Sequence, residues 1–133
     1  MLQRTILKSV IIKGIGLHSG NNVEMKISPA KENSGIYFIR TDLDKKTIVE
    51  ASIKNVSKSN RSTCLLKNKV KIKTIEHFLA ACWGCNIDNL EIKLNKEELP
   101  ILDGSSKEFI KIFEETGFKE LGEEQKKYIV KNY

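Results

Sequence analysis

Glu76 and His77 place a carboxylate and an imidazole side by side within the segment 74–85. The segment is mostly apolar after His77, which predicts a short, largely buried helix with Thr74 as its N-cap. Glu76 and His77 would then lie in the first turn, where the positive end of the helix favours an ionised carboxylate and a neutral imidazole. Those are the states of a general base and of a metal ligand. The alternative is a capped helix whose Glu and His occupy a partly solvated edge.

His18 is a second residue that could do chemistry, and it lies in the glycine-rich loop 14–20. The glycines follow the spacing G-x-G-x-x-x-G, and residues 22–28 alternate like a strand, so the loop does not match the dinucleotide-binding fingerprint. Two interpretations remain open. The loop is either a wide β-hairpin that needs positive φ angles, or a glycine loop that holds His18 near a polar ligand.

The chain has three cysteines, an odd number that suits a reducing compartment and does not make a disulfide framework. Cys82 and Cys85 have C-x-x-C spacing, and together with Cys64 and His77 they could form a structural Cys₃His zinc site. A buried free thiol on an apolar helix is the simpler interpretation of Cys82. Redox catalysis is disfavoured because the pair stands at the carboxyl end of the helix, where the dipole raises a thiol pKa.

Length and composition favour one globular α+β domain: 133 residues, 40% hydrophobic and 30% charged. The net charge of +6 suits acidic partners. However, the lysines are scattered and only three of the 23 basic residues are Arg, which argues against a nucleic-acid-binding module. No apolar run approaches the roughly 18 residues of a membrane span, and no signal-peptide pattern is present, so we expect no transmembrane segment and a cytoplasmic location.

The elements that would position these residues can be read from hydrophobic periodicity. Ser105 and Glu108 form an expected capping box, followed by the apolar stripe Phe109, Ile112 and Phe113 and by Gly117 as the C′ residue. The order of elements predicts a two-layer sandwich, with two helices on one face of a mostly antiparallel sheet. The expected strands are 5–13, 22–28, 36–40, 48–56, 63–66, 70–73 and 88–94.

The polar composition changes from residue 119 onward. We therefore expect residues 1–118 to form one domain. Residues 119–133 would be a linker followed by the first residues of a second domain.

Seven short motifs stand in the order and at the spacing of one known family. They occupy residues 3–5, 16–20, 40–43, 62–65, 74–81, 87–89 and 100–105. In this order and spacing, the chain resembles the amino-terminal domain of UDP-3-O-acyl-N-acetylglucosamine deacetylases, the zinc enzymes of lipid A synthesis. The resemblance implies a fold like the second domain of ribosomal protein S5.

The resemblance also implies roles for individual residues. His77 matches the zinc ligand that this domain contributes, and Glu76 matches the general base that acts on the zinc-bound water. The substrate would be UDP-3-O-acyl-N-acetylglucosamine. The residues that fall where the family lines the rim of its active site, and so are expected near substrate, are His18, Ser62, Thr63 and Cys64.

Half of the expected active site has no counterpart in this sequence. The family takes its other two zinc ligands, a His and an Asp, from a second domain, whereas the histidines here are His18 and His77. We therefore expect the isolated chain to lack deacetylase activity and to need a second domain or a separate carboxy-terminal half. Apolar surface left exposed at that interface would promote self-association.

Overall fold

The computed structural model describes residues 1–58 and 62–126. Its main sheet has five strands in the spatial order β2-β3-β9-β4-β5. All neighbouring strands are antiparallel except β4 and β9, which are parallel. The strands are β2 (Val10–Ile15), β3 (Asn22–Pro29), β4 (Ile36–Arg40), β5 (Ile48–Glu50) and β9 (Leu90–Leu94).

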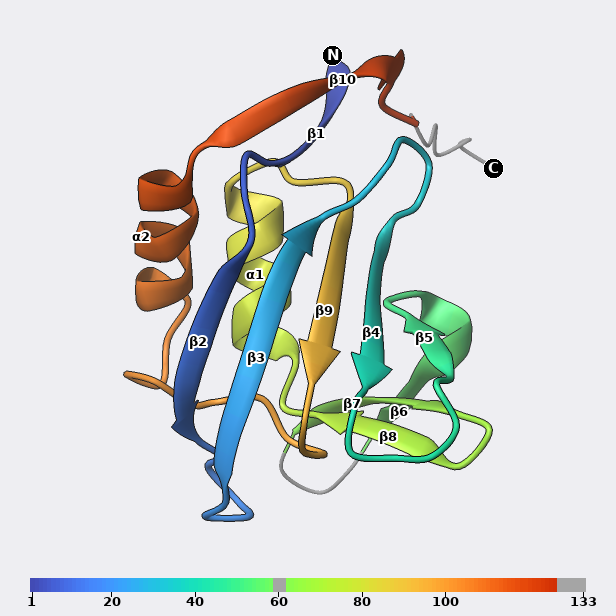
Figure 1. The fold of residues 1–133 in the computed structure, drawn as a ribbon, viewed down its shortest axis with the longest axis vertical. Helices are drawn as coiled ribbons and strands as arrows, with labels where there is room; N and C mark the ends of the chain where they lie inside the picture. Colours follow the sequence, from blue (N-terminus) through green and yellow to red (C-terminus); the bar gives the residue numbers. More distant parts are fainter. Residues whose placement is uncertain (59–61, 127–133) are drawn as a thin grey trace, which may run out of the picture.

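Two helices, α1 (Glu76–Gly84) and α2 (Lys107–Thr116), cover one face of this sheet (Figure 1). Side chains on β3 alternate accordingly: Val23, Met25 and Ile27 are buried under the helices, whereas Glu24 and Lys26 are exposed on the open face. The arrangement confirms the predicted α+β sandwich with both helices on one face of a mostly antiparallel sheet.

Phe78 joins the two layers. Its ring lies 6.0 Å from that of Phe38 on β4, and 5.4 and 5.8 Å from those of Phe109 and Phe113 on α2. These edge-on and tilted contacts fix how α1 is rotated about its axis. Because His77 precedes Phe78 directly, the same contacts determine which side of the helix carries its imidazole.

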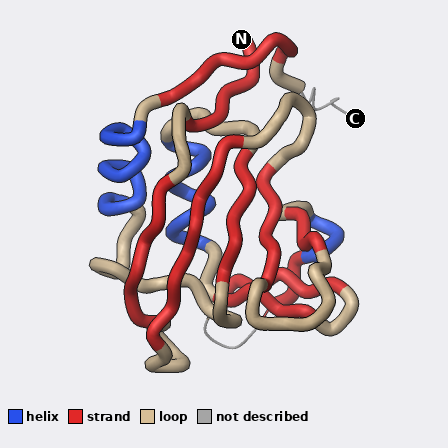
Figure 2. The backbone as a smooth tube through the Cα atoms, in the orientation of Figure 1, coloured by secondary structure: helices blue, strands red, loops and turns tan. Residues whose placement is uncertain are grey.

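A smaller sheet contains β6 (Val56–Lys58), β7 (Thr63–Lys67) and β8 (Val70–Lys73), preceded by a short 3₁₀ turn, η1 (Ile53–Asn55). Asn68 and Lys69 form the β7–β8 turn with φ angles of 50° and 67°, as expected for a two-residue hairpin. Arg40 connects this sheet to the main one, because its guanidinium donates to the carbonyl of Lys71 at 3.0 Å. Figure 2 shows the small sheet beside one end of the main sheet.

A two-stranded ribbon of β1 (Leu2–Ile6) and β10 (Phe118–Glu124) lies at the other end of the main sheet (Figure 1). Two expectations were wrong here. The expected strand 5–13 is divided between β1 and β2, and the polar residues up to Glu124 form a strand instead of a linker. β10 is exposed along most of its length and has no alternating apolar pattern, so its sequence looks like a connecting segment. The domain boundary at 118 stays a prediction, and residues 127–133 lie outside the described residues.

Both helix starts also differ from expectation. Ile75, not Thr74, is the N-cap residue of α1, and it makes no side-chain capping bond. Ser106, not Ser105, is the N-cap residue of α2. The backbone N–H of Ser105 donates to Asp103 instead of Glu108, so the reciprocal capping box does not form. Gly117 does end α2, with a φ of 90°.

Candidate functional site

Glu76 and His77 are the first two residues of α1, so both lie in its first turn as predicted. Both side chains are half-buried. Glu76 Oε2 accepts the backbone N–H of Thr63 at 2.9 Å. The carbonyl of Thr63 in turn accepts the N–H groups of Thr74 and Ile75, at 3.1 and 3.2 Å. These reciprocal bonds hold the start of α1 against the beginning of β7.

Thr74 has a backbone conformation that β-branched residues rarely adopt. Its φ is 61°, in the left-handed region, and its side chain is buried. Its hydroxyl points away from the helix and donates to Glu98 Oε2 at 2.6 Å, which explains why it does not cap α1. The strain at this position is held by bonds to Thr63 and Glu98, directly before Ile75 and Glu76.

Glu98 is the residue that the sequence analysis missed. The side chain is only 2% exposed, which is rare for a carboxylate. Its Oε1 accepts the N–H groups of His18 and Ser19 at 3.0 and 2.9 Å, while Oε2 accepts the Thr74 hydroxyl. Burial by itself would raise the pKa of Glu98, but the hydrogen bonds from Thr74, Ser19 and His18 together hold it below its ordinary value. One signal was available in the sequence: Glu98 stands directly before the four apolar residues 99–102.

The glycine loop therefore reaches the start of α1 through Glu98. The loop closes on itself through the Gly20 N–H, which donates to the Gly16 carbonyl at 3.0 Å. His18 is exposed, and its position is defined by the bond from its backbone N–H to Glu98. Figure 1 shows the β2–β3 loop, the end of β8 and the start of α1 at the same end of the main sheet.

The other expected rim residues lie at the start of β7. Thr63 contacts Glu76 directly, as described above, and Ser62 has its hydroxyl 3.6 Å from the Cys64 sulfur. Cys64 itself is 4% exposed. The structure therefore brings Thr63 to Glu76, with Ser62 directly before Thr63 in the chain. The Cys64 thiol lies among buried side chains. Whether any of the three contacts a substrate stays a prediction.

The alternative Cys/His zinc site is not assembled. Within residues 1–58 and 62–126, no three His, Cys, Asp or Glu side chains are grouped so that they could hold a metal ion. Cys64, Cys82, Cys85 and His77 all belong to this described part, and they are not grouped as a four-ligand site would require. Burial raises the pKa of Cys82 strongly, and the nearby Cys85 adds to the effect. His77 is thus left as a single imidazole donor at the start of α1.

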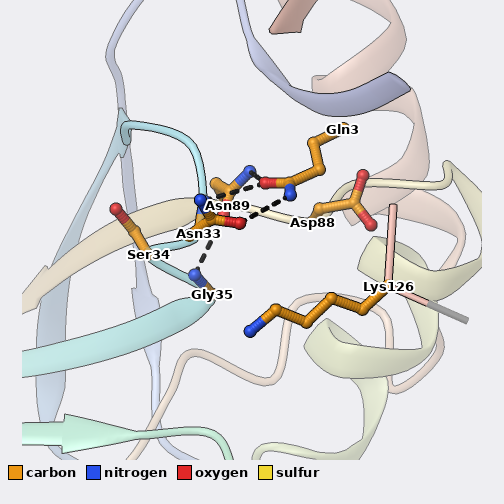
Figure 3. A pocket seen from close by; sticks show the side chains of 7 residues that line it. All are labelled: Gln3, Asn33, Ser34, Gly35, Asp88, Asn89 and Lys126. Carbon is orange, nitrogen blue, oxygen red and sulfur yellow. Dashed lines mark hydrogen bonds between the residues drawn. The ribbon is translucent and has the colours of Figure 1, made fainter. Parts of the chain in front are cut away.

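A hollow with a volume of about 300 Å³ lies elsewhere, near the β1–β10 ribbon, and Glu76 does not line it. Figure 3 shows the residues that line it. The amides of Gln3 and Asn89 inside it bond to each other at 3.0 Å, and Asn89 also accepts the Gly35 N–H at 2.9 Å. Because these buried polar groups satisfy one another, we interpret the hollow as structural.

Comparison with known proteins places the chain in a family. Residues 3–133 match the family model described as LpxC, UDP-3-O-acyl N-acetylglycosamine deacetylase. The chain belongs to this deacetylase family. Relatives named UDP-3-O-acyl-N-acetylglucosamine deacetylase, from three strains of Coxiella burnetii, are 42% identical over 118 residues. The match covers 89% of this chain and 39% of each relative, so the chain spans well under half of their length.

Residues that could do chemistry are concentrated at one end of the main sheet. In this deacetylase-family chain, that end holds Glu76 and His77 together with the loop of His18, and Glu98 connects the two parts. Across residues 1–58 and 62–126, no helix is both long and apolar enough to cross a membrane.

Proposed function

We propose that this chain is the amino-terminal half of a zinc-dependent deacetylase that hydrolyses the N-acetyl group of UDP-3-O-acyl-N-acetylglucosamine in the cytoplasm. Glu76 is the general base and His77 is a metal ligand. The observation that carries the proposal is the adjacent Glu76–His77 pair at the start of α1, in a chain that matches the deacetylase family over residues 3–133.

His77 suits zinc because a half-buried imidazole is a common zinc donor. A catalytic zinc site takes about three protein ligands and keeps one position open. The described residues do not complete such a set. We assign the remaining ligands to the part of the relatives that this chain does not cover. Zinc bound there would polarise the acetyl carbonyl and lower the pKa of a water molecule.

Glu76 supplies the proton transfer that hydrolysis needs. Its Oε2 accepts the Thr63 N–H, which fixes the plane of the carboxylate. We assign Oε1 as the atom that takes the proton from the attacking water. Attack on the acetyl carbonyl would form the new C–O bond and break the C–N bond, and the proton taken up by Glu76 would pass to the sugar nitrogen, so that acetate and the free amine are released.

The predicted substrate contacts surround this carboxylate. Thr63 lies against Glu76, Ser62 precedes it at the start of β7, and Cys64 follows it. His18 approaches from the glycine loop on the other side of Glu98. Ser62, Thr63 and His18 would lie near the substrate, whereas the thiol of Cys64 is buried behind the surface. The net charge of +6 favours an anionic ligand.

A chimera tests this function. The chain is joined to the portion of a Coxiella burnetii relative that it does not cover, and release of acetate from UDP-3-O-acyl-N-acetylglucosamine is measured. We expect an active chimera and an inactive isolated chain. Glu76→Gln should lower kcat by about 10²- to 10⁴-fold, the usual contribution of a general base. His77→Ala should reduce both zinc content and rate.

Glu97→Gln is the matched control, because Glu97 is partly exposed and pairs with Lys73 at 2.8 Å on the surface. It should retain the parental rate. An active chimera whose kcat is unchanged by Glu76→Gln would disprove the assignment of the general base. A folded, zinc-loaded chimera without deacetylase activity would contradict the proposed function as a whole.

A further inference from the structure

We infer that Glu98 is a positioning residue that locks the loop carrying His18 to the strained turn before Glu76 and His77. Its effect on turnover rests on the proposed deacetylase function. The lock itself is a property of this chain and is tested independently of any activity.

The hydrogen bonds of Glu98 connect segments that are distant in the sequence. Oε1 accepts from the backbone of His18 and Ser19, 80 and 79 residues away, and Oε2 accepts from the Thr74 hydroxyl, 24 residues away. Because the side chain is almost completely buried, these bonds are shielded from water and are the stronger for it. A charged group buried without such partners would be costly.

The backbone on both sides of Glu98 holds it in place. On one side, the Lys73 N–H donates to the Glu97 carbonyl at 2.8 Å and the Leu99 N–H donates to the Lys73 carbonyl at 3.1 Å. On the other side, the Ile101 N–H donates to the Ile15 carbonyl at 2.9 Å. The segment 97–101 is therefore fixed between the end of β8 and the end of β2. Glu98 sits where its carboxylate can reach both.

Gly16 makes room for this carboxylate. A Cβ atom at position 16 would lie 2.5 Å from Glu98 Oε1 and 2.5 Å from Ser19 Oγ. Such distances are far below van der Waals contact, so any side chain there would displace the carboxylate or the loop. The glycine thus serves the close approach of Glu98 to the loop backbone.

The three donors also explain why an acid is needed. Two N–H groups and one O–H group converge on one side chain, and an ionised carboxylate accepts at every position without offering a donor. A Gln side chain has nearly the same shape. With its Oε1 toward His18 and Ser19, its NH₂ would face Thr74, whose hydroxyl would have to turn from donor to acceptor. Glu98→Gln therefore keeps the volume and removes the charge.

The first test uses the 133-residue chain and needs no activity. We expect the amide protons of His18 and Ser19 to resonate downfield, as donors to a buried carboxylate do. In Glu98→Gln both resonances should move upfield, and both amides should exchange with solvent about tenfold faster, as weaker charge-assisted bonds allow. Glu97→Gln changes the same charge one residue away and should leave both amides unaltered. Glu98→Ala is a second variant that removes the acceptor altogether. If it does not fold, the result for Glu98→Gln decides.

The second test measures kinetics in the chimera. Glu98→Gln should raise KM about tenfold, the effect of one weakened charge-assisted hydrogen bond, because the loop of His18 is released. The value of kcat should change little, since Glu76 keeps its own bond to Thr63. A merely structural role would lower the amount of folded enzyme without this split between KM and kcat.

The outcomes separate the two proposals. Unchanged amide shifts and exchange rates in Glu98→Gln would overturn the lock, whatever the chimera does. Altered amides with an unchanged KM in an active chimera would overturn the positioning role while leaving the deacetylase function intact. A folded, zinc-loaded but inactive parental chimera would refute the proposed function, and the amide measurements would still decide whether Glu98 holds the loop.

Discussion

Single side chains at the start of α1 show how a polar site is built at the edge of an apolar core. Phe78 is fully buried, whereas His77 and Glu76 directly before it are half-buried. The helix N-terminus places its unpaired N–H groups in the same region. The contacts of Thr63 and Glu98 restrain the turn from outside the helix. The site is therefore preorganised by neighbours that take no part in proton transfer themselves.

The burial of Cys82 predicts a low reactivity of its thiol. Burial raises its thiol pKa, and the neighbouring Cys85 adds to the effect, so less thiolate is present near neutral pH. Burial raises the pKa of Cys85 as well, with a further contribution from Glu114. In the native chain at pH 8, we expect iodoacetamide to modify Cys82 far more slowly than in urea. Mass spectrometry of the alkylated peptides measures this.

The control for this experiment is Cys85, which is only partly buried and is the C-cap residue of the same helix. It should be modified before Cys82. Rapid alkylation of native Cys82, at the rate seen in urea, would mean that the C-x-x-C pair is reactive and that its structural interpretation is wrong.

Between elements, Arg40 at the end of β4 pairs with Asp42 in the loop that follows, and its guanidinium also reaches the small sheet. Arg40 donates to both carboxylate oxygens of Asp42, at 2.8 and 2.7 Å, and to the carbonyl of Lys71 on β8. Arg40 is itself buried, so its charge depends on these acceptors. Because β8 leads into the turn of Thr74, this pair supports the position of the site from a distance.

The pair predicts a pH dependence of stability. Hydrogen bonding to Arg40 holds the pKa of Asp42 below its ordinary value of 3.8, although partial burial opposes the shift. Its stabilisation is therefore complete above that ordinary value and is lost as the pH falls through the lower folded value. Asp42→Asn should lower the free energy of unfolding in urea by about 1 to 3 kcal/mol at pH 7. The difference should shrink below pH 3.8.

The exposed Asp44 lies in the same loop, so Asp44→Asn is the matched control. It should unfold like the parental chain at both pH values. An Asp42→Asn deficit that persists undiminished in acid would show that the carboxylate charge is not what stabilises the connection.

For the whole molecule, the incomplete metal site has a measurable consequence. His77 is the single zinc ligand that we assign to this chain, and the affinity of one imidazole is weak. Titration of the reduced chain with zinc, followed by calorimetry, should show weak or no binding. Tight one-to-one binding that survives His77→Ala and is lost in Cys82→Ser/Cys85→Ser would instead establish a structural cysteine site.

One exposed aromatic side chain bears on the self-association expected from the sequence. Trp83, on α1, is 87% exposed, although large aromatic side chains are usually well covered. The self-association expected from the sequence stays a prediction, and Trp83→Ser offers a direct way to examine it by size-exclusion chromatography at increasing concentration.

The sequence by itself determined the elements with strong local patterns. Alternation revealed β3 and β9, the stripe of Phe109 and Phe113 revealed α2, and the adjacency of Glu76 and His77 was sufficient to locate the candidate site. These features could be predicted because they depend on neighbours within a few residues. The β1–β10 ribbon could not, because β10 is largely exposed and mostly polar, and its pairing joins the two ends of the described chain.

Only the tertiary structure decided the role of Glu98 and the conformation of Thr74. As an isolated Ser/Thr before an apolar run, Thr74 has the pattern of an N-cap. Its left-handed φ and its bond to Glu98 arise because the segment 97–101 is bound between β8 and β2. Local propensity favours a capping hydroxyl, but a buried carboxylate in need of donors has more to gain from the same group. The hydrogen bonds of Glu98 to Thr74 and His18 span 24 and 80 residues of sequence, so no local sequence pattern could predict them.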